Sequence, residues 1–167
     1  MVGYWNQSKQ TFNIDSSRWF DTGDVGWIDS HGNLWLVGRT KYQIKSGGEN
    51  IHPEEVEAVL CQHPGLAAAV VIGIPDHRLY EKVVACVSIN QKWNWVTDKS
   101  CSSVEVNKLS AEILQEHCRQ KRLTGFKIPK VYIPWKKPFP LCSSGKLRRE
   151  DFKREVMSYF RNPRSSL

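Results

Sequence analysis

The stretch Ala67-Ala68-Ala69-Val70-Val71-Ile72-Gly73-Ile74, followed by Val83-Val84-Ala85-Cys86-Val87-Ser88-Ile89, decides the fold of this chain. Both runs are apolar and rich in β-branched residues, and each has the length of a strand rather than of a helix. The segment Pro75–Lys82 between them is polar and is expected to form a loop. The two runs therefore predict neighbouring strands that are buried in a sheet.

Elements of alternating type are expected on both sides of these two strands. A proline at the first turn and two acids near the positive end of the dipole predict that a helix begins at Pro53 and ends before His63. The remaining predicted elements are a strand around Tyr42–Lys45, a helix of about residues 107–122, a strand at Lys130–Trp135 and a last helix at Leu147–Phe160. This order predicts a small α+β domain with a three-stranded central sheet and flanking helices. Cys86 and Cys118 are expected in its core.

A separate β-hairpin is predicted before this domain. Val25–Asp29 and Leu34–Val37 are strand-like runs, and Ser30–Asn33 between them is a cluster of turn-forming residues. The first residues carry no recognisable start of a domain. Gln91–Ser103, with Trp93 and Trp95, is expected to be a surface loop with a local aromatic anchor.

The charge of the chain is unevenly distributed. Its 167 residues carry a formal net charge of +7, but residues 1–118 hold 10 basic and 14 acidic side chains, a balance of −4, whereas residues 119–167 hold 14 basic and 3 acidic ones, a balance of +11. Such asymmetry points to a polyanionic partner, which could be nucleic acid, anionic lipid or a phosphate-rich small molecule. The five cysteines include no Cys-x-x-Cys pair, the five histidines show no metal-ligand spacing, and no apolar run is long enough for a membrane span.

Four short motifs carry the chemistry of the chain. In order they are Trp19-Phe20-Asp21-Thr22-Gly23-Asp24, Gly38-Arg39-Thr40-Lys41-Tyr42-Gln43-Ile44-Lys45, Gly47-Gly48-Glu49-Asn50-Ile51-His52-Pro53-Glu54-Glu55-Val56-Glu57 and Pro140-Leu141-Cys142-Ser143-Ser144-Gly145-Lys146. Together they resemble the adenylate-forming superfamily of acyl-CoA synthetases, luciferases and peptide-synthetase adenylation domains. The segments at residues 19–24, 47–50, 83–87 and 123–130 are most similar to the plant members that activate 2-succinylbenzoate in phylloquinone biosynthesis.

The resemblance implies an acid–CoA ligase. Such enzymes activate a small carboxylate with ATP and Mg²⁺ to an acyl-adenylate, and then form the thioester with coenzyme A. It also implies that residues 1–38 end a large AMP-binding domain, that residues 39–41 are a hinge, and that residues 42–160 are the small C-terminal domain. The phosphate loop and acyl pocket of the large domain are expected before residue 1, so the chain is expected to be a fragment that is inactive alone. The acid itself is left open, and a 4-coumarate- or fatty-acid-type ligase is an alternative.

Three residues are expected at the nucleotide. Lys146 follows a side-chain-poor loop, and its compact ammonium suits contact with both the substrate carboxylate and the α-phosphate of ATP. Asp24 is suited to accept hydrogen bonds from the ribose diol, and Arg39 can reach ribose or phosphate with its fork of donors. The alternatives are a solvated lysine, a turn-capping aspartate and a surface salt bridge, respectively.

The same resemblance places the hinge at Lys41, where many relatives carry Asp. A swing about this hinge is expected to replace Lys146 in the cleft by the face around Lys45, Gly47, Gly48 and Glu49. Glycines allow close approach of the pantetheine arm of CoA, and Lys45 is expected to polarise the acyl-adenylate. A strand-edge lysine that discourages aggregation is the alternative for Lys45.

The CoA nucleotide is expected on Phe126, Lys127 and Lys130, an aromatic ring for the adenine and lysines for the phosphates. Some relatives place a cation where Ile128 stands and a tryptophan where Leu79 stands, and the two lysines could equally be solvated.

The C-terminal residues Ser165-Ser166-Leu167 resemble a peroxisomal address of the Ser-Lys-Leu type, with chloroplast and cytoplasm as alternatives. A rival from another class is a basic module that holds nucleic acid. It would interleave basic residues with exposed aromatics along one face, but two of the basic groups fall inside ligase motifs, so no nucleic acid is expected.

Overall fold

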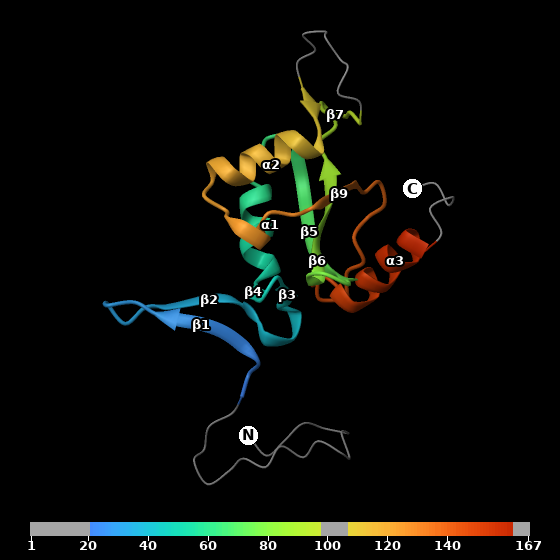
Figure 1. The fold of residues 1–167 in the computed structure, drawn as a ribbon. Coiled ribbons are helices and arrows are strands. Elements are labelled where there is room, and N and C mark those ends of the chain that lie inside the picture. The colour runs from blue at the N-terminus through green and yellow to red at the C-terminus, as the bar shows by residue number, and fades with distance from the viewer. Residues whose placement is uncertain (1–20, 98–106, 162–167) are drawn as a thin grey trace.

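The computed structural model describes residues 21–97 and 107–161 (Figure 1). Nine strands and three α-helices are assigned within these residues, with short 3₁₀ turns at Thr40–Tyr42 and Gly125–Lys127. They are β1 (Asp24–Ile28), β2 (Leu34–Arg39), β3 (Ile44–Ser46), β4 (Glu49–Ile51), α1 (Pro53–Leu60), β5 (Leu66–Asp76), β6 (Tyr80–Ile89), β7 (Asn94–Trp95), β8 (Lys108–Leu109), α2 (Ala111–Gln120), β9 (Val131–Pro134) and α3 (Arg149–Arg161).

The main sheet is built around the antiparallel pair β5 and β6. Their register runs from Leu66 opposite Ile89 to Asp76 opposite Tyr80. Strand β9 lies parallel to β6 through Val84 to Val87, and β3 joins β6 at the single pair Ser46–Tyr80, with β4 outside β3. The expected α+β class with flanking helices is confirmed. The sheet has five strands, because the short hairpin of β3 and β4 extends the three central ones.

Alternate residues of β5 and β6 face two different cores. Val71, Val83, Ala85 and Val87 belong to a cluster with α1 and α2, whereas their neighbours Val70, Ile72, Val84 and Cys86 belong to a second cluster with α3. Figure 1 shows the sheet between α1 and α2 on one side and α3 on the other. This is why the two sequence runs are apolar throughout: both faces of the strands are covered. Cys86 and Cys118 are buried, as expected.

Local sequence explains where the helices begin. Pro53 is the first residue of α1, with Glu54 and Glu55 in its first turn. The side chain of Ser110 accepts a hydrogen bond from the backbone N–H of Ile113 at 3.3 Å and thereby caps α2. That cap places the start of α2 at Ala111, inside the expected range of 107–122.

The connection between β5 and β6 differs from the expected loop at Pro75–Lys82. Strand β5 continues to Asp76 and β6 begins at Tyr80, so the turn is only three residues long. Asp76 stabilises this turn, because its carboxylate accepts hydrogen bonds from the backbone N–H groups of Arg78 and Leu79 and pairs with Lys82 at 2.9 Å. These bonds lower the pKa of Asp76 to about 2, with the Lys82 hydrogen bond as the largest cause. The polar composition of residues 75–82 led to the expectation of a loop, whereas the structure has a tight hairpin.

The expected hairpin is present as β1 and β2, which form a two-stranded sheet of their own and project from the end of the main sheet (Figure 1). Asp29 organises its turn by accepting hydrogen bonds from Trp35, Asn33 and His31, and the Trp35 bond is the largest cause of its pKa of about 2. The large apolar side chains of the hairpin are more than half exposed: Trp27, Ile28, Leu34, Trp35 and Leu36.

Trp93 and Trp95 anchor the segment after β6. Both are half-buried and pack against the cluster that contains α1 and α2, and β7 pairs with β8 in parallel. The segment expected to be only a loop therefore contributes one strand, β7, to a third, two-stranded sheet.

Candidate functional site: a glycine turn, a hinge segment and a lysine loop

The turn between β3 and β4 holds four of the expected site residues. Lys45 lies in β3, Gly47 and Gly48 form the turn, and Glu49 begins β4. Both glycines have positive φ, +58° at Gly47 and +86° at Gly48, a conformation that side chains with a Cβ rarely adopt. The backbone N–H of Gly47 donates to the carbonyl of Leu79 at 3.0 Å, which ties this turn to the β5–β6 hairpin.

Phe126 lies directly on this glycine turn. A Cβ atom on Gly47 would be 2.5 Å from the ring of Phe126, and one on Gly125 would be 3.3 Å from a carboxylate oxygen of Glu49. Gly48, in contrast, has open space where a Cβ would stand. The structure therefore brings Gly47, Glu49 and Phe126 together from segments far apart in the sequence.

The two lysines expected to bind CoA phosphates differ in their surroundings. Lys127 is half-buried and its ammonium pairs with Glu55 of α1 at 2.7 Å. Lys130 is exposed and precedes β9, where its backbone N–H donates to the carbonyl of Val83 at 3.0 Å. Of the two, Lys130 has the ammonium that is more accessible to a ligand.

Lys45 is exposed at the edge of the same turn, opposite Asn50 in β4. Its backbone N–H donates to Glu81 at 2.9 Å, and the other carboxylate oxygen of Glu81 pairs with Lys153 of α3 at 2.9 Å. The backbone at Lys45 is thus fixed while its side chain is open to solvent.

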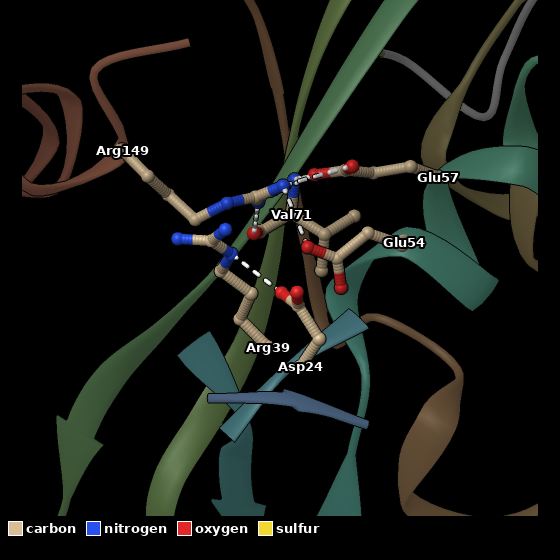
Figure 2. Close-up of polar contacts among 6 residues, drawn as sticks. All are labelled: Asp24, Arg39, Glu54, Glu57, Val71 and Arg149. Carbon is tan, nitrogen blue, oxygen red and sulfur yellow. Dashed lines mark hydrogen bonds and ion pairs between the residues drawn. The ribbon is translucent and has the colours of Figure 1, made fainter. Parts of the chain in front are cut away.

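Asp24 and Arg39 pair with each other across the hairpin. They are direct partners in the β1–β2 register, and the Arg39 Nε atom lies 2.8 Å from a carboxylate oxygen of Asp24 (Figure 2). Both side chains are about one-third exposed or more, so the pair is of the weak surface kind. The two residues expected to bind the nucleotide therefore contact each other. Because their ion pair is weak, each side chain can leave its partner and bind the nucleotide instead.

Lys41 lies in the 3₁₀ turn at Thr40–Tyr42 that directly follows β2. Its ammonium is 4.6 Å from the centre of the Tyr42 ring, and the guanidinium of Arg149 is 5.5 Å from the same ring. A cavity of about 100 Å³ lies beside this turn, lined by Lys41, Tyr42, Glu81, Arg149 and Lys153 among others. The expected hinge segment and the start of α3 are thus neighbours.

Lys146 lies in a small loop between β9 and α3. The loop is closed by hydrogen bonds from the N–H of Cys142 to the carbonyl of Lys146 at 2.8 Å and from the N–H of Arg148 to the carbonyl of Pro140 at 2.9 Å. Lys146 is exposed, as are Ser143, Ser144 and Gly145. The Lys146 ammonium pairs with no acidic side chain among residues 21–97 and 107–161.

One charged network was missed by sequence reasoning. Arg149, the first residue of α3, donates two hydrogen bonds to Glu57 of α1, at 2.7 and 3.1 Å, and one to the carbonyl of Val71 in β5 at 2.9 Å (Figure 2). Its guanidinium also pairs with Glu54 at 3.4 Å. Glu54 and Glu57 are three positions apart, which puts both carboxylates on one face of α1. This spacing could have indicated a site for a cation, but no neighbouring residue identifies Arg149 as their partner.

Three expectations concern a metal site, a membrane span and the C-terminal address. Within residues 21–97 and 107–161, no group of three or more His, Cys, Asp and Glu side chains could hold a metal ion. Nor does that part of the chain contain a helix with the length and apolarity needed to cross a bilayer. The expected address Ser165-Ser166-Leu167 lies outside the described residues.

Comparison with known proteins defines the class. The profile of the AMP-binding enzyme C-terminal domain matches residues 55–146, more than half of the chain. The chain belongs to this family.

Three relatives illustrate the match. The chain is 49% identical to the chloroplastic/peroxisomal 2-succinylbenzoate–CoA ligase of Arabidopsis thaliana, over all of this chain and 30% of that protein. It is 32% identical to a mitochondrial medium-chain acyl-CoA ligase of Mus musculus, over 96% of this chain and 24% of that protein. The o-succinylbenzoate CoA synthetase of Bacillus subtilis, solved with its acyl-adenylate intermediate, superposes with a TM-score of 0.73 at 31% identity, over 90% of this chain and 28% of that one. The chain thus spans less than a third of the length of these relatives.

Proposed function

We propose that this chain supplies the C-terminal part of an acid–CoA ligase that converts 2-succinylbenzoate into its CoA thioester for phylloquinone biosynthesis. The observation that carries the proposal is the 49% identity to the Arabidopsis ligase over the whole chain. The similarity to medium-chain acyl-CoA ligases is lower but also extends over almost the whole chain, which makes a different acid the alternative.

In the first step of this reaction, a carboxylate oxygen of the acid attacks the α-phosphorus of ATP. The bond to the bridging oxygen breaks, and pyrophosphate leaves. Lys146 is the residue we assign to the developing negative charge, because its side chain is exposed on a loop whose backbone is closed by hydrogen bonds. Asp24 and Arg39 are assigned to the ribose and the phosphates of the nucleotide.

In the second step, the CoA thiol gives up its proton to solvent, and the resulting thiolate sulfur attacks the acyl carbon while AMP leaves. We assign the pantetheine arm to Gly47, Gly48 and Glu49, because open space lies above Gly48. Lys45 is assigned to the carbonyl oxygen of the acyl-adenylate. The nucleotide of CoA is assigned to Phe126 and Lys130, and Lys127 would have to exchange Glu55 for a phosphate. We assign no described residue to Mg²⁺, since none of the described groups has the ligand set for a metal ion.

The partner of the chain in this proposal is a large AMP-binding domain. The exposed apolar side chains of the β1–β2 hairpin support it, because so many large apolar residues on one small hairpin indicate a surface that packs within a larger domain. Residues 1–38 would belong to that domain, residues 42–160 would form the small domain, and residues 39–41 would be the hinge between them.

The contact between the β1–β2 hairpin and α1 has features of a weak interface, one that can separate when the small domain moves. Around Gly38 of β2, the Nδ1 atom of His52 and one carboxylate oxygen of Glu54 are buried without a hydrogen-bond partner in the described structure. Unsatisfied polar atoms make such an interface weaker than a packed apolar one. This supports a hinge at Lys41.

The experiment that tests the proposal is a chimera. The 167-residue chain replaces the matching segment of the Arabidopsis ligase, and pyrophosphate release is measured with ATP, Mg²⁺ and 2-succinylbenzoate, with a reaction that lacks the acid as the control. We expect release with 2-succinylbenzoate and none from the 167-residue chain alone. A folded chimera that lacks this activity while the parent enzyme retains it would contradict the proposal. Turnover by the chain alone would contradict the need for a large domain.

We also propose that Ser165-Ser166-Leu167 directs the protein to peroxisomes, which the chloroplastic/peroxisomal location in the name of the Arabidopsis relative supports. A fluorescent protein placed at the N-terminus leaves Leu167 free, and removal of Leu167 provides the matched control. Peroxisomal fluorescence that persists without Leu167 would contradict this assignment.

A further inference from the structure

Arg149 connects three parts of the fold that are distant in sequence. It lies three residues after Lys146, and its side chain is only 12% exposed. Its guanidinium donates to both carboxylate oxygens of Glu57 in α1 and to the carbonyl of Val71 in β5, and it lies over the ring of Tyr42 next to the hinge segment. Figure 2 shows the side chain extending from the start of α3 toward α1.

The carboxylate of Glu57, which accepts these hydrogen bonds, is itself held in place by a further hydrogen bond. The same Glu57 oxygen that accepts from Arg149 also accepts the backbone N–H of Val71 at 2.7 Å. Arg149 and Glu57 therefore clamp the peptide segment at Val71 together, one binding its carbonyl and the other its N–H. We call Arg149, Glu57 and the Val71 backbone the α3 clamp.

The Lys146 loop depends on its base for its position. Its internal hydrogen bonds give it a shape, but Lys146 and the three residues before it are exposed. At the base of the loop, Leu147 packs against the core cluster around α3. Arg149 is the next residue after Arg148, whose backbone N–H closes the loop. Among the residues that the structure describes, the α3 clamp is the polar attachment to α1 and β5 that lies nearest to Lys146 in the chain.

We propose that Arg149 is a positioning residue for Lys146, which through the α3 clamp holds the lysine loop in the orientation that the adenylation step requires. This inference rests on the function proposed above, because it needs Lys146 to act in that step. It goes beyond that function in assigning a role to a residue that contacts none of the three substrates in our assignment.

The chemistry of the clamp suits arginine specifically. The guanidinium is planar and carries five N–H donors, so it can bind both oxygens of a carboxylate and a carbonyl at once, which a lysine ammonium cannot do in one fixed geometry. Burial disfavours the charged form of Arg149, but the hydrogen bonds and charge of Glu57 outweigh this and raise its pKa. The guanidinium in the clamp therefore stays charged throughout the neutral pH range.

The alternative is that Arg149 only stabilises the domain. The two half-reactions separate these roles. Adenylation is assigned to Lys146, whereas formation of the thioester from a supplied acyl-adenylate is assigned to the turn at Lys45–Glu49, which is not part of the clamp. A general loss of stability slows both steps, while a misplaced Lys146 slows only the first.

The test compares Arg149→Met with Arg148→Met in the chimera described above. Arg148 is the matched control, because it is the adjacent arginine but is exposed and pairs with Asp151 in the first turn of α3, at 2.6 Å. We expect Arg149→Met to slow pyrophosphate release at least tenfold, since a displacement of about 1 Å can cost ~100-fold in rate. Thioester formation from supplied acyl-adenylate should be unchanged. If Arg149→Met does not fold, Arg149→Lys serves instead, with a smaller slowing of the same step.

A second measurement is independent of activity. Hydrogen exchange of the amides of Cys142, Gly145 and Arg148 is followed in the 167-residue chain itself, with each variant. We expect faster exchange in Arg149→Met and Arg149→Lys but not in Arg148→Met. Equal slowing of both half-reactions, or unchanged exchange at these amides, would overturn the inference. An inactive wild-type chimera would count against the proposed function, and the exchange measurement would still decide whether Arg149 orders the loop.

Discussion

Gly47 lies under the ring of Phe126 so closely that a Cβ at this glycine would stand 2.5 Å from the nearest ring carbons. Gly47 also has a φ of +58° and donates its N–H to Leu79. The glycine is therefore required twice, by its backbone conformation and by the ring packed on it. This contact joins the β3–β4 turn to the 3₁₀ turn at Gly125–Lys127, the two segments to which we assign CoA.

Substitution of Gly47 and Gly48 by alanine separates these two requirements. Gly48→Ala meets open space, so we expect only the left-handed backbone penalty of about 1–2 kcal/mol. Gly47→Ala should cost more, because the ring of Phe126 must also move. Urea unfolding of the 167-residue chain measures both, and the excess for Gly47→Ala should shrink when Phe126 is replaced by leucine. Equal losses for the two single variants would show that the ring contact is unimportant.

Lys146 and Lys45 are expected to affect opposite half-reactions. In the chimera, Lys146→Met should slow pyrophosphate release by roughly 100- to 1,000-fold and leave thioester formation from supplied acyl-adenylate unaffected, because a positioned cation at developing charge is worth that much. Lys45→Met should show the reverse. Lys121→Met, an exposed lysine after α2, is the control. If one substitution abolishes both steps, the two faces do not act alternately.

Cys142 should be the first of the four described cysteines to react with iodoacetamide. A hydrogen bond with the Ser144 hydroxyl, at 3.1 Å, is the largest cause that lowers the pKa of its thiol. Burial raises the pKa of Cys61 and Cys118, and that of Cys86 to about 12. Mass spectrometry after brief labelling near neutral pH gives the order. Because Cys142 lies in the Lys146 loop, labelling should also slow adenylation in the chimera, and Cys142→Ser should be protected. Faster labelling of Cys61 would contradict the expected order.

Asp76 should make stability depend on pH in the acid range. Its folded-state pKa of about 2 lies below the ordinary 3.8, so the native state binds fewer protons than the unfolded state between these values. The resulting stabilisation is complete above the ordinary pKa and is lost as the pH falls from 3.8 toward about 2. In urea unfolding, the difference between wild type and Asp76→Asn should be largest near neutral pH and shrink in this window. Lys82→Met should weaken the same dependence, because Lys82 is the main cause of the shift. A difference that stays constant on acidification would refute this account.

The ring of Phe152 should dominate the attachment of α3. It is completely buried and packs edge-on against Trp135 and Phe139 at 5.0 and 5.3 Å between ring centres. Phe152→Ala should destabilise the domain by about 3–5 kcal/mol, because it removes a large buried side chain and leaves a cavity. Thermal unfolding followed by tryptophan fluorescence measures this loss, with the partly exposed Tyr159→Ala as a milder comparison. A loss no greater than that of Tyr159→Ala would argue against this packing.

Much of the fold follows from local patterns. The strand runs at residues 67–74 and 83–89, the helix start at Pro53 and the hairpin before Gly38 lie where the sequence places them, because strand length, proline position and turn residues act over a few positions. The β5–β6 turn, expected as a longer loop, and strand β4, which was not expected, depend on hydrogen bonds and strand pairings that composition does not reveal. The four motifs likewise indicate the family correctly, because each is a short run of neighbouring residues.

The sequence by itself thus determined the α+β class, the order of elements and the family, since these are set by local periodicity and by short motifs. Only the tertiary structure decided which side chains meet. Arg149 and Glu57 are 92 positions apart, and Phe126 and Gly47 lie in different turns. Such contacts are fixed by how α1, α3 and the turns pack on one sheet. The residues next to Arg149 or Phe126 in the sequence do not indicate which distant residue it contacts. The clamp behind Lys146 is therefore a property of the folded molecule.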